Sequence, residues 1–293
     1  MTFLEELESK ILDVNQALHK YLEEKDNPQA TIYKAMDYSL HAGGKRIRPV
    51  LMLASSELLG AESEKVMPFA CALEMIHTYS LIHDDLPCMD DDDLRRGKPT
   101  NHKVFGEAIA VLAGDGLLNL AYETILKHSQ VSPNMTLAAM SIIAESAGVE
   151  GMIGGQVIDL ESEGKTVDAI TLMTMHLHKT AALIMAAARV GALLGGGGRE
   201  DLLAVEEFSR YLGIAFQIKD DILDVSGTEE NLGKPIGSDG ENEKSTFVTI
   251  YGLEASEKML ADYTEKAIES LSRFGEKAEF LIGLSKFLLD RDR

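Results

Sequence analysis

Apolar residues recur at steps of three and four along most of this 293-residue chain, for example at Leu137, Met140, Ile143 and Ala144. Such spacing is typical of helices that bury one face. Only seven prolines occur, and none lies between residues 134 and 234. A proline-free interval of that length fits long helices joined by glycine turns, such as the turn expected at 195–198. The pattern therefore predicts an all-α protein.

The chain contains no linker, low-complexity tract or convincing repeat, so we interpret residues 1–293 as a single domain. With 28 basic and 48 acidic residues, its formal net charge of −20 argues against nucleic-acid binding. The apolar run at 181–188 is far shorter than the roughly 20 residues of a membrane span. Because there are two cysteines and no signal-peptide pattern, we expect a cytoplasmic protein without a membrane span.

A first cluster of acidic residues follows an apolar stretch of helical character. Residues 69–82 are largely apolar, Asp84 and Asp85 come after them, and Pro87 is expected to end the helix. Carboxylates at a helix C-terminus oppose its dipole, so they cost stability unless a cation binds there. The run of four acids at 90–93 taken alone can also be a solvated loop. For Asp84 and Asp85 we expect a divalent metal as the counter-charge.

A second acidic cluster lies in the segment 205–225, which is apolar over most of a helical circumference. In a helix, Gln217, Asp220, Asp221 and Asp224 share one stripe. A helix that is apolar nearly all round is buried, so this stripe is expected to face an internal cavity; a solvent-facing amphipathic helix is the alternative. Oxygen ligands without thiolates suit magnesium bridging to a phosphate better than zinc.

Basic residues occur in three places where they can meet a phosphate. The segment 43–49 (GGKRIRP) supplies three positive charges behind two glycines, without the spacing of a P-loop. Arginine forks and backbone amides are suited to a diphosphate. The remaining cations of this kind are Arg95, Arg96, Lys179, Lys234 and Lys244. The glycines at 154–155 and 195–198 follow no plausible strand, so we interpret them as helix contacts and turns and not as nucleotide loops.

Five ordered segments resemble the short-chain, all-trans isoprenyl diphosphate synthases, in particular the bacterial farnesyl diphosphate synthases. They are GGKRIRP at 43–49, IHDDLPCMDDDDLRRGKPTNH at 82–102, Lys179-Thr180, FQIKDDILD at 216–224, and the segment 233–246. Either aspartate motif would be weak evidence alone, whereas five segments at family spacing are strong. The resemblance implies a single-domain helical bundle around a deep central cavity, assembled as a homodimer.

The resemblance also implies a reaction and its metal. We expect magnesium-dependent, head-to-tail condensation of isopentenyl diphosphate with dimethylallyl and then geranyl diphosphate, which gives (2E,6E)-farnesyl diphosphate. A geranyl or geranylgeranyl diphosphate synthase is the alternative. The expected ligands of several Mg²⁺ ions, which bridge the allylic diphosphate, are Asp84, Asp90 and Asp220. Asp85, Asp221 and Asp224 are expected to act through water or by orienting the ligands.

Further residues of the matching segments are expected to handle the two diphosphates. Those for the allylic diphosphate and its ionisation are Arg95, Lys179, Lys234 and Lys244, with Thr180 and Gln217 facing the carbocation. Those for isopentenyl diphosphate, bound without metal, are Lys45, Arg48, His77 and Arg96. A lone histidine on a helix is usually a core or surface residue. His77, however, stands seven residues before Asp84 and so shares its helix face.

Product length is expected to depend on the helix that ends at Asp84. Ser80 lies one turn before Asp84, and Tyr79 lies five residues before it, roughly 7.5 Å along the axis. A prenyl tail bound at Asp84 would run down this helix, so these side chains can form the floor of its pocket. In the related bacterial farnesyl synthases an aromatic residue here goes with a fifteen-carbon product. The alternative is that Tyr79 is an ordinary core aromatic.

Three other functions compete with this interpretation. A class I terpene cyclase also ionises a diphosphate at an aspartate motif, but it needs no second diphosphate pocket, so GGKRIRP and Arg96 argue against it. An HD-type phosphohydrolase would need histidine partners for His83 and Asp84, and none is suitably spaced in the sequence. A catalytically silent subunit would be expected to have lost one acidic cluster, yet both are intact.

Overall fold

The computed structural model describes residues 1–23, 25–226 and 245–289. In order, the elements of these ranges are α1 (Phe3–Tyr21), α2 (Ala30–Leu40), α3 (Ile47–Glu57), α4 (Ser63–Asp84), β1 (Leu94–Arg95), β2 (Lys98–Pro99), α5 (Asn101–Phe105), α6 (Glu107–His128), α7 (Pro133–Ala147), α8 (Met152–Ser162), α9 (Ala169–His176), the π-helix η1 (Leu177–Ala181), α10 (Ala182–Leu194), α11 (Arg199–Ser226), α14 (Phe247–Tyr251), α15 (Leu253–Ser270), the 3₁₀-helix η2 (Ser272–Ala278) and α16 (Glu279–Leu289). The one short ribbon among them pairs β1 with β2 antiparallel. The prediction of an all-α fold is confirmed.

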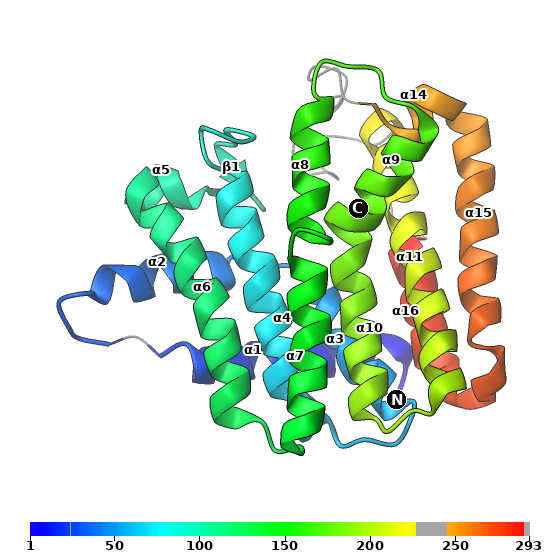
Figure 1. The fold of residues 1–293 in the computed structure, drawn as a ribbon, viewed down its shortest axis with the longest axis horizontal. Coiled ribbons are helices and arrows are strands. Elements are labelled where there is room, and N and C mark those ends of the chain that lie inside the picture. Colours follow the sequence, from blue (N-terminus) through cyan, green and yellow to red (C-terminus); the bar gives the residue numbers. More distant parts are fainter. Residues whose placement is uncertain (24, 227–244, 290–293) are drawn as a thin grey trace.

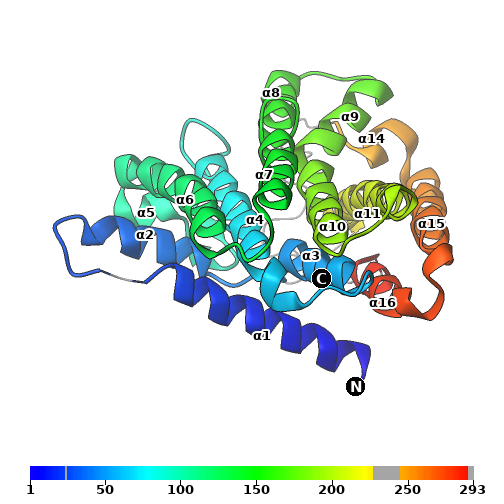
Figure 2. The ribbon, with the colours of Figure 1, turned by 60° about the horizontal axis from the view of Figure 1, so that its bottom comes forward.

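The helices form a bundle in which α4 and α10 are central (Figure 1). Helix α4 packs between α6 and α3 and also contacts α10. Helix α10 packs against α3, α7 and α11, and α15 covers the other side of α11. Figure 2 shows α1 running beneath α3 and α4, so that it closes one end of the bundle. This packing leaves the C-terminal end of α4 facing α8 and η1.

Helix α4 is buried on nearly every side because its sequence is apolar nearly all round. Phe69 and Cys71 are fully buried in it. The helix ends at Asp84, and Asp85 is its C-cap, just before Pro87. The sequence prediction that the first acids lie on the last turn and in the following loop is therefore confirmed.

The apolar spacing predicted a helix at α7 correctly, but only part of its stripe is buried. Ile143 is fully buried, whereas Leu137 is 63% exposed and Ala144 is exposed. Neighbouring α6 also exposes apolar side chains, including Leu112 and Leu126. Helical periodicity therefore identified the element without identifying which apolar positions face the core.

Three stretches of the described chain are long and apolar enough to cross a bilayer, judged by length and composition alone. They are Glu107–His128, Pro133–Ser162 and Ala169–Leu194. The first is α6, and the other two join α7 with α8 and α9 with α10. In the fold each packs against other helices of the bundle. The absence of a membrane span thus stays a prediction.

Candidate active site

A cavity of 330 Å³ opens between α3, α4, α8, η1 and α10. It brings together seven residues that the sequence predicted for the site: Arg48, His77, Tyr79, Ser80, Asp84, Lys179 and Thr180. Its other walls are mainly apolar and include Met152, Ile153, Val157 and Leu183. The cavity thus joins charged groups at one side to an apolar chamber along α4.

The first acidic cluster is built on the end of α4. The backbone N–H of Asp90 donates to the carbonyl of Asp84 at 2.9 Å, which folds the loop back onto the helix end. Burial raises the pKa of Asp84, and the negative charges of Asp90 and Asp159 raise it further. The strongest opposing effect is that of Lys179, whose Nζ lies 4.0 Å from Asp84 Oδ1. Ionised carboxylates that lie close together in a buried place are stabilised when a cation binds among them.

Helix α8 contributes two residues that sequence reasoning missed. Gln156 Nε2 donates to Asp84 Oδ1 at 2.7 Å, and Asp159 Oδ2 accepts from Lys179 Nζ at 2.5 Å. Burial lowers the pKa of Lys179, but the charges of Asp84 and Asp159 outweigh this effect, so it is raised overall. Gln156 and Asp159 are three residues apart and so share a helix face. The sequence does carry a signal for them, because two polar residues on one face of an otherwise apolar helix indicate a polar contact inside the fold.

The segment at 154–155 was interpreted correctly as a helix contact, and the contact serves the site. A Cβ on Gly155 would lie 2.1 Å from the backbone nitrogen of Lys179, so only glycine lets α8 approach η1. Lys179 and Thr180 lie within the π-helical turn of η1, a form that is frequently found at functional sites. Together the close approach and the wide turn bring Lys179 towards Asp84.

Asp85 and Arg95 form a pair behind the main cavity. Arg95 Nε donates to Asp85 Oδ1 at 2.5 Å, and its Nη2 donates to Asp92 at 3.2 Å. Burial raises the pKa of Asp85 to about 7 although Arg95 opposes it. Arg95 and Arg96 line a smaller hollow of 30 Å³, next to Asp85, and not the main cavity. Arg95 therefore contacts the first acidic cluster through Asp85, from the smaller hollow and not from the main cavity.

The segment 43–49 was expected to present three positive charges to a diphosphate, and for Arg46 this was wrong. Its guanidinium is buried, donating to Glu74 at 2.8 Å, to the Leu40 carbonyl at 2.6 Å and to Asn15 at 2.9 Å. Arg46 has a left-handed backbone with φ of 51°, which turns its side chain into the core. Lys45 is exposed. Of the three basic residues, Lys45 and Arg48 therefore remain outside the Arg46 contacts in the core, and Arg48 lines the cavity.

Arg96 packs directly on the glycines of this segment. Its Nη1 donates to the carbonyl of Gly43, and a Cβ on Gly44 would lie 2.5 Å from the same nitrogen. Gly44 has a φ of 118°, so glycine is required there both for the backbone conformation and for the approach of Arg96. The two predicted basic segments therefore meet in space.

Arg48 and His77 line the cavity in a field of positive charge. Burial lowers the pKa of Arg48 to about 10, Glu74 and Asp220 oppose this, and Arg96 adds to it. Arg48 Nε is buried and has no hydrogen-bond partner in the described part of the chain. Burial also lowers the pKa of His77 well below its usual value, and the positive charges of Arg48 and Arg96 lower it further. An anion bound here would relieve both effects.

The second acidic cluster, on α11, does not act as one stripe. Asp221 Oδ2 accepts at 2.7 Å from the backbone N–H of Phe247, the first residue of α14, whose N-cap is Thr246. Asp224 is also buried, whereas Asp220 is partly exposed and its charge reaches Arg48. The expectation of a single cavity-facing stripe was thus too simple: the charge of Asp220 reaches Arg48, although Asp220 is not among the residues that line the cavity, whereas Asp221 holds α14.

Gln217 lies one turn before Asp221 and bonds to a buried histidine. Its Nε2 lies 3.1 Å from His176 Nδ1, so the imidazole accepts and the amide oxygen points away from it. Burial lowers the pKa of His176 to about 4, which keeps the ring neutral. His176 was not expected from the sequence. The predicted residues Lys234 and Lys244 lie outside the described residues.

Tyr79 and Ser80 lie where the apolar chamber follows α4. Tyr79 is buried, and its ring meets His83 edge to face with centroids 5.7 Å apart. Ser80 Oγ donates to the carbonyl of His77 at 2.8 Å. Both line the cavity together with Asp84, as the proposed path of a prenyl tail requires.

Comparisons with known proteins point to one family. The family model "Polyprenyl synthetase" matches residues 29–280. The chain is 47% identical to "Farnesyl diphosphate synthase" of Geobacillus stearothermophilus, over 95% of this chain and 94% of that protein. It is 46% identical to "Geranylgeranyl pyrophosphate synthase, chloroplastic" of Capsicum annuum, over 97% of this chain and 77% of that protein. A crystal structure of an FPP/GFPP synthase from Zymomonas mobilis superposes with a TM-score of 0.89 at 34% identity and covers 98% of each chain.

Proposed function

The chain belongs to the polyprenyl synthetase family, and from this premise we propose that it is a prenyltransferase that condenses isopentenyl diphosphate head to tail with dimethylallyl and then geranyl diphosphate. The proposed main product is (2E,6E)-farnesyl diphosphate. The observation that carries the proposal is the one cavity in which Asp84 and Lys179 are joined to Arg48 and His77. The reaction needs a binding site for each of two diphosphates. The cavity offers an acidic end at Asp84 and a basic end at Arg48 and His77.

We propose that Asp84, Asp90 and Asp220 hold Mg²⁺ at the acidic end. The donor set fits a hard divalent cation because these ligands are carboxylate oxygens. Burial, followed by the charges of Asp90 and Asp159, raises the pKa of Asp84, and Lys179 does not fully offset these effects. Magnesium, when bound, would stabilise the charge that develops on the leaving diphosphate. Gln156 orients Asp84, which is a role of outer hydrogen-bond donors at metal sites.

Cations of the chain bind the same allylic diphosphate directly. Lys179 pairs with Asp84 and Asp159 at this end, and we assign its ammonium group to a phosphate oxygen of the allylic substrate. Arg95 is held beside Asp85 and adds positive charge near the leaving group. Lys234 and Lys244 are proposed for the same role from the sequence alone. Such fixed charges lower the barrier to breaking the C–O bond.

The carbocation that follows needs nearby oxygen dipoles and a dry site. Thr180 lines the cavity, and the amide oxygen of Gln217 is left available because its nitrogen bonds to His176. The apolar walls formed by Met152, Val157 and Leu183 exclude water, which would otherwise hydrolyse the cation.

Isopentenyl diphosphate is proposed to bind at the basic end, held by Lys45, Arg48, His77 and Arg96. Arg48 and Arg96 supply forked donors for a phosphate. His77 enters as a neutral ring because of its low pKa, and it can donate one N–H. The double bond of the bound substrate then attacks the cation, and the released proton goes to the departing diphosphate.

The fifteen-carbon length is proposed from Tyr79, because relatives that make farnesyl and geranylgeranyl chains are nearly equally similar. The buried ring of Tyr79 stands against His83 in the path of the tail. We further propose that the protein works in the cytoplasm as a homodimer, for which the exposed apolar side chains of α6, such as Leu112 and Leu126, are a suitable surface.

Radiolabelled isopentenyl diphosphate and Mg²⁺, given with and without an allylic co-substrate, test the proposal. We expect label in farnesol after dephosphorylation when dimethylallyl or geranyl diphosphate is present, and no product without either. Incorporation into a cyclic hydrocarbon, or none with any allylic diphosphate, would contradict it. Geraniol or geranylgeraniol as the main product would keep the reaction and overturn the length.

A further inference from the structure

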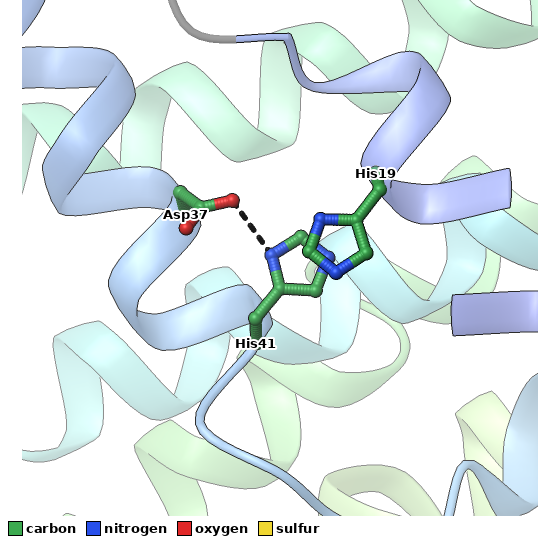
Figure 3. Close-up of side chains that lie close together, drawn as sticks. All are labelled: His19, Asp37 and His41. Carbon is green, nitrogen blue, oxygen red and sulfur yellow. Dashed lines mark hydrogen bonds and ion pairs between the residues drawn. The ribbon is translucent and has the colours of Figure 1, made fainter. Parts of the chain in front are cut away.

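A second cluster of metal-binding side chains lies away from the cavity, where α1 meets the end of α2 (Figure 3). His19 is on the last turn of α1, Asp37 is on α2, and His41 directly follows α2. The two imidazole rings are stacked with centroids 3.6 Å apart and planes 2° apart. One candidate ligand atom from each of the three residues lies within 4.8 Å of the others.

Asp37 fixes the tautomer of His41. Asp37 Oδ1 lies 2.7 Å from His41 Nδ1, so the carboxylate accepts and the Nδ1 atom carries the proton. The lone pair of His41 is therefore on Nε2. This atom is buried and has no hydrogen-bond partner in the part of the chain that the structure describes. Figure 3 shows the His19 ring lying over the edge of His41 that faces away from Asp37.

We propose that His19 and His41 bind one divalent transition-metal ion of the zinc type, and that Asp37 orients His41 for it. A carboxylate that accepts the second N–H of a ligating imidazole is a recurrent feature of such sites. Two nitrogens bound to one zinc ion lie about 3.3 Å apart for Zn–N bonds near 2.05 Å. His19 is exposed, so its ring can turn out of the stack to point a nitrogen at the same ion.

The chemistry of this site differs from that of the aspartate clusters. Imidazole nitrogens favour zinc, copper or nickel, whereas carboxylate and water oxygens favour magnesium. Burial lowers the pKa of His41; Asp37 opposes this, and the charges of His19 and Arg46 add to it, so the neutral ring is favoured as a ligand. The proposal does not depend on the reaction proposed above.

A bound ion would join α1 to α2 at the base of the segment 43–49. Arg46 closes the other side of this base, with bonds to Asn15 of α1, the Leu40 carbonyl of α2 and Glu74 of α4. Zinc should therefore raise the temperature of unfolding as well as bind.

Equilibrium dialysis of the full chain against Zn²⁺, with excess Mg²⁺ to occupy the aspartates, tests the site. We expect the wild type to bind one more zinc ion per chain than His19→Ala and His41→Ala. Asp37→Asn should bind this ion about 10- to 100-fold more weakly. The matched control is His128→Ala, because His128 is also exposed and packs on Tyr21 at the end of α1; it should bind as the wild type does.

One further readout, the unfolding temperature, separates the proposal from a merely structural role of the histidine stack. Zinc should raise the unfolding temperature of wild type and His128→Ala but not that of His19→Ala. Because the His19 side chain is exposed, its removal should not unfold the protein, so loss of the fold would not explain this difference. Equal zinc binding by wild type and His19→Ala would overturn the proposal. So would a wild type that binds zinc only as weakly as the two histidine variants.

Discussion

The two ends of the cavity carry opposite charge imbalances. At the end of α4, burial and the charges of Asp90 and Asp159 raise the pKa of Asp84, with Lys179 as the main opposing group. Where the start of α3 faces His77 of α4, burial and the charges of Arg48 and Arg96 lower the pKa of His77. The first end is stabilised by a cation and the second by an anion. One cavity can therefore hold two diphosphates by different means, through metal at the acidic end and directly at the basic end.

The comparison also shows why the charge imbalance at each end is not neutralised by neighbouring residues of the same segment. The acids are placed by a helix end and by α8, and the cations by two glycines that let Arg96 approach. Neither end has enough opposite charge within its own segment. Each is therefore poised for a ligand, at some cost to the stability of the empty protein.

The largest effect should come from removing acids at the metal end. Asp84→Ala, Asp90→Ala and Asp220→Ala should each lower turnover by about three powers of ten or more, since each removes charge that holds the metal. Steady-state assays at saturating Mg²⁺, with circular dichroism as the control for folding, provide the measurement. Comparable activity in any of the three would contradict the assignment. Asp221→Ala is a matched comparison that should mainly cost stability, because it removes the acceptor of the first backbone N–H of α14.

Removing cations should separate the ends by substrate. Arg48→Ala and Arg96→Ala should raise the KM for isopentenyl diphosphate about 10- to 100-fold, because a charged hydrogen bond to phosphate is lost. Lys179→Ala should act mainly on the allylic substrate. The measurement is KM for each substrate with the other saturating. An inverted pattern would mean that the two ends had been exchanged.

The apolar chamber between the ends should control product length. Tyr79→Ala should let chains of twenty carbons or more accumulate, because the tail can pass the floor. Ser80→Phe should shift the product towards ten carbons by blocking the second addition. Chromatography of dephosphorylated products gives the distribution. An unchanged fifteen-carbon product in both variants would place the floor elsewhere.

The smallest expected effect is a proton taken up at the basic end. In the empty protein the pKa of His77 is well below its usual value, so the ring stays neutral and stability falls as pH drops below about 6.5, where the unfolded chain gains a proton. A bound diphosphate should raise that pKa, so binding near pH 6 should take up part of a proton. Calorimetry in two buffers of different ionisation enthalpy measures this uptake. His77→Gln should abolish it, and equal uptake in that variant would assign it to another group.

Local sequence was sufficient for one end of the site. The apolar stretch and Pro87 predicted that α4 ends at the first acids, because both signals act within a few residues. Helical spacing then placed Tyr79 and Ser80 on the same helix before Asp84, and the family resemblance gave them their expected role. The all-α fold could be predicted for the same reason.

Contacts between distant segments could not be predicted. Gln156 reaches Asp84 only because α8 packs closely on η1, and that depends on Gly155. Arg46 and Arg48 are two residues apart in one motif, yet one is in the core and the other lines the cavity. The left-handed backbone at Arg46 decides this, and no pattern in the sequence reports it.

Binding of each diphosphate with and without Mg²⁺ tests the division of the cavity most directly. The ligands are isopentenyl diphosphate and a geranyl thiolodiphosphate that does not ionise, titrated by calorimetry into the wild type, Asp84→Asn and Arg48→Ala. The geranyl analogue should need Mg²⁺ and bind poorly to Asp84→Asn, while isopentenyl diphosphate should bind equally with or without Mg²⁺ and poorly to Arg48→Ala. The same Mg²⁺ requirement for both ligands, or a geranyl analogue that binds tightly without Mg²⁺, would contradict the account.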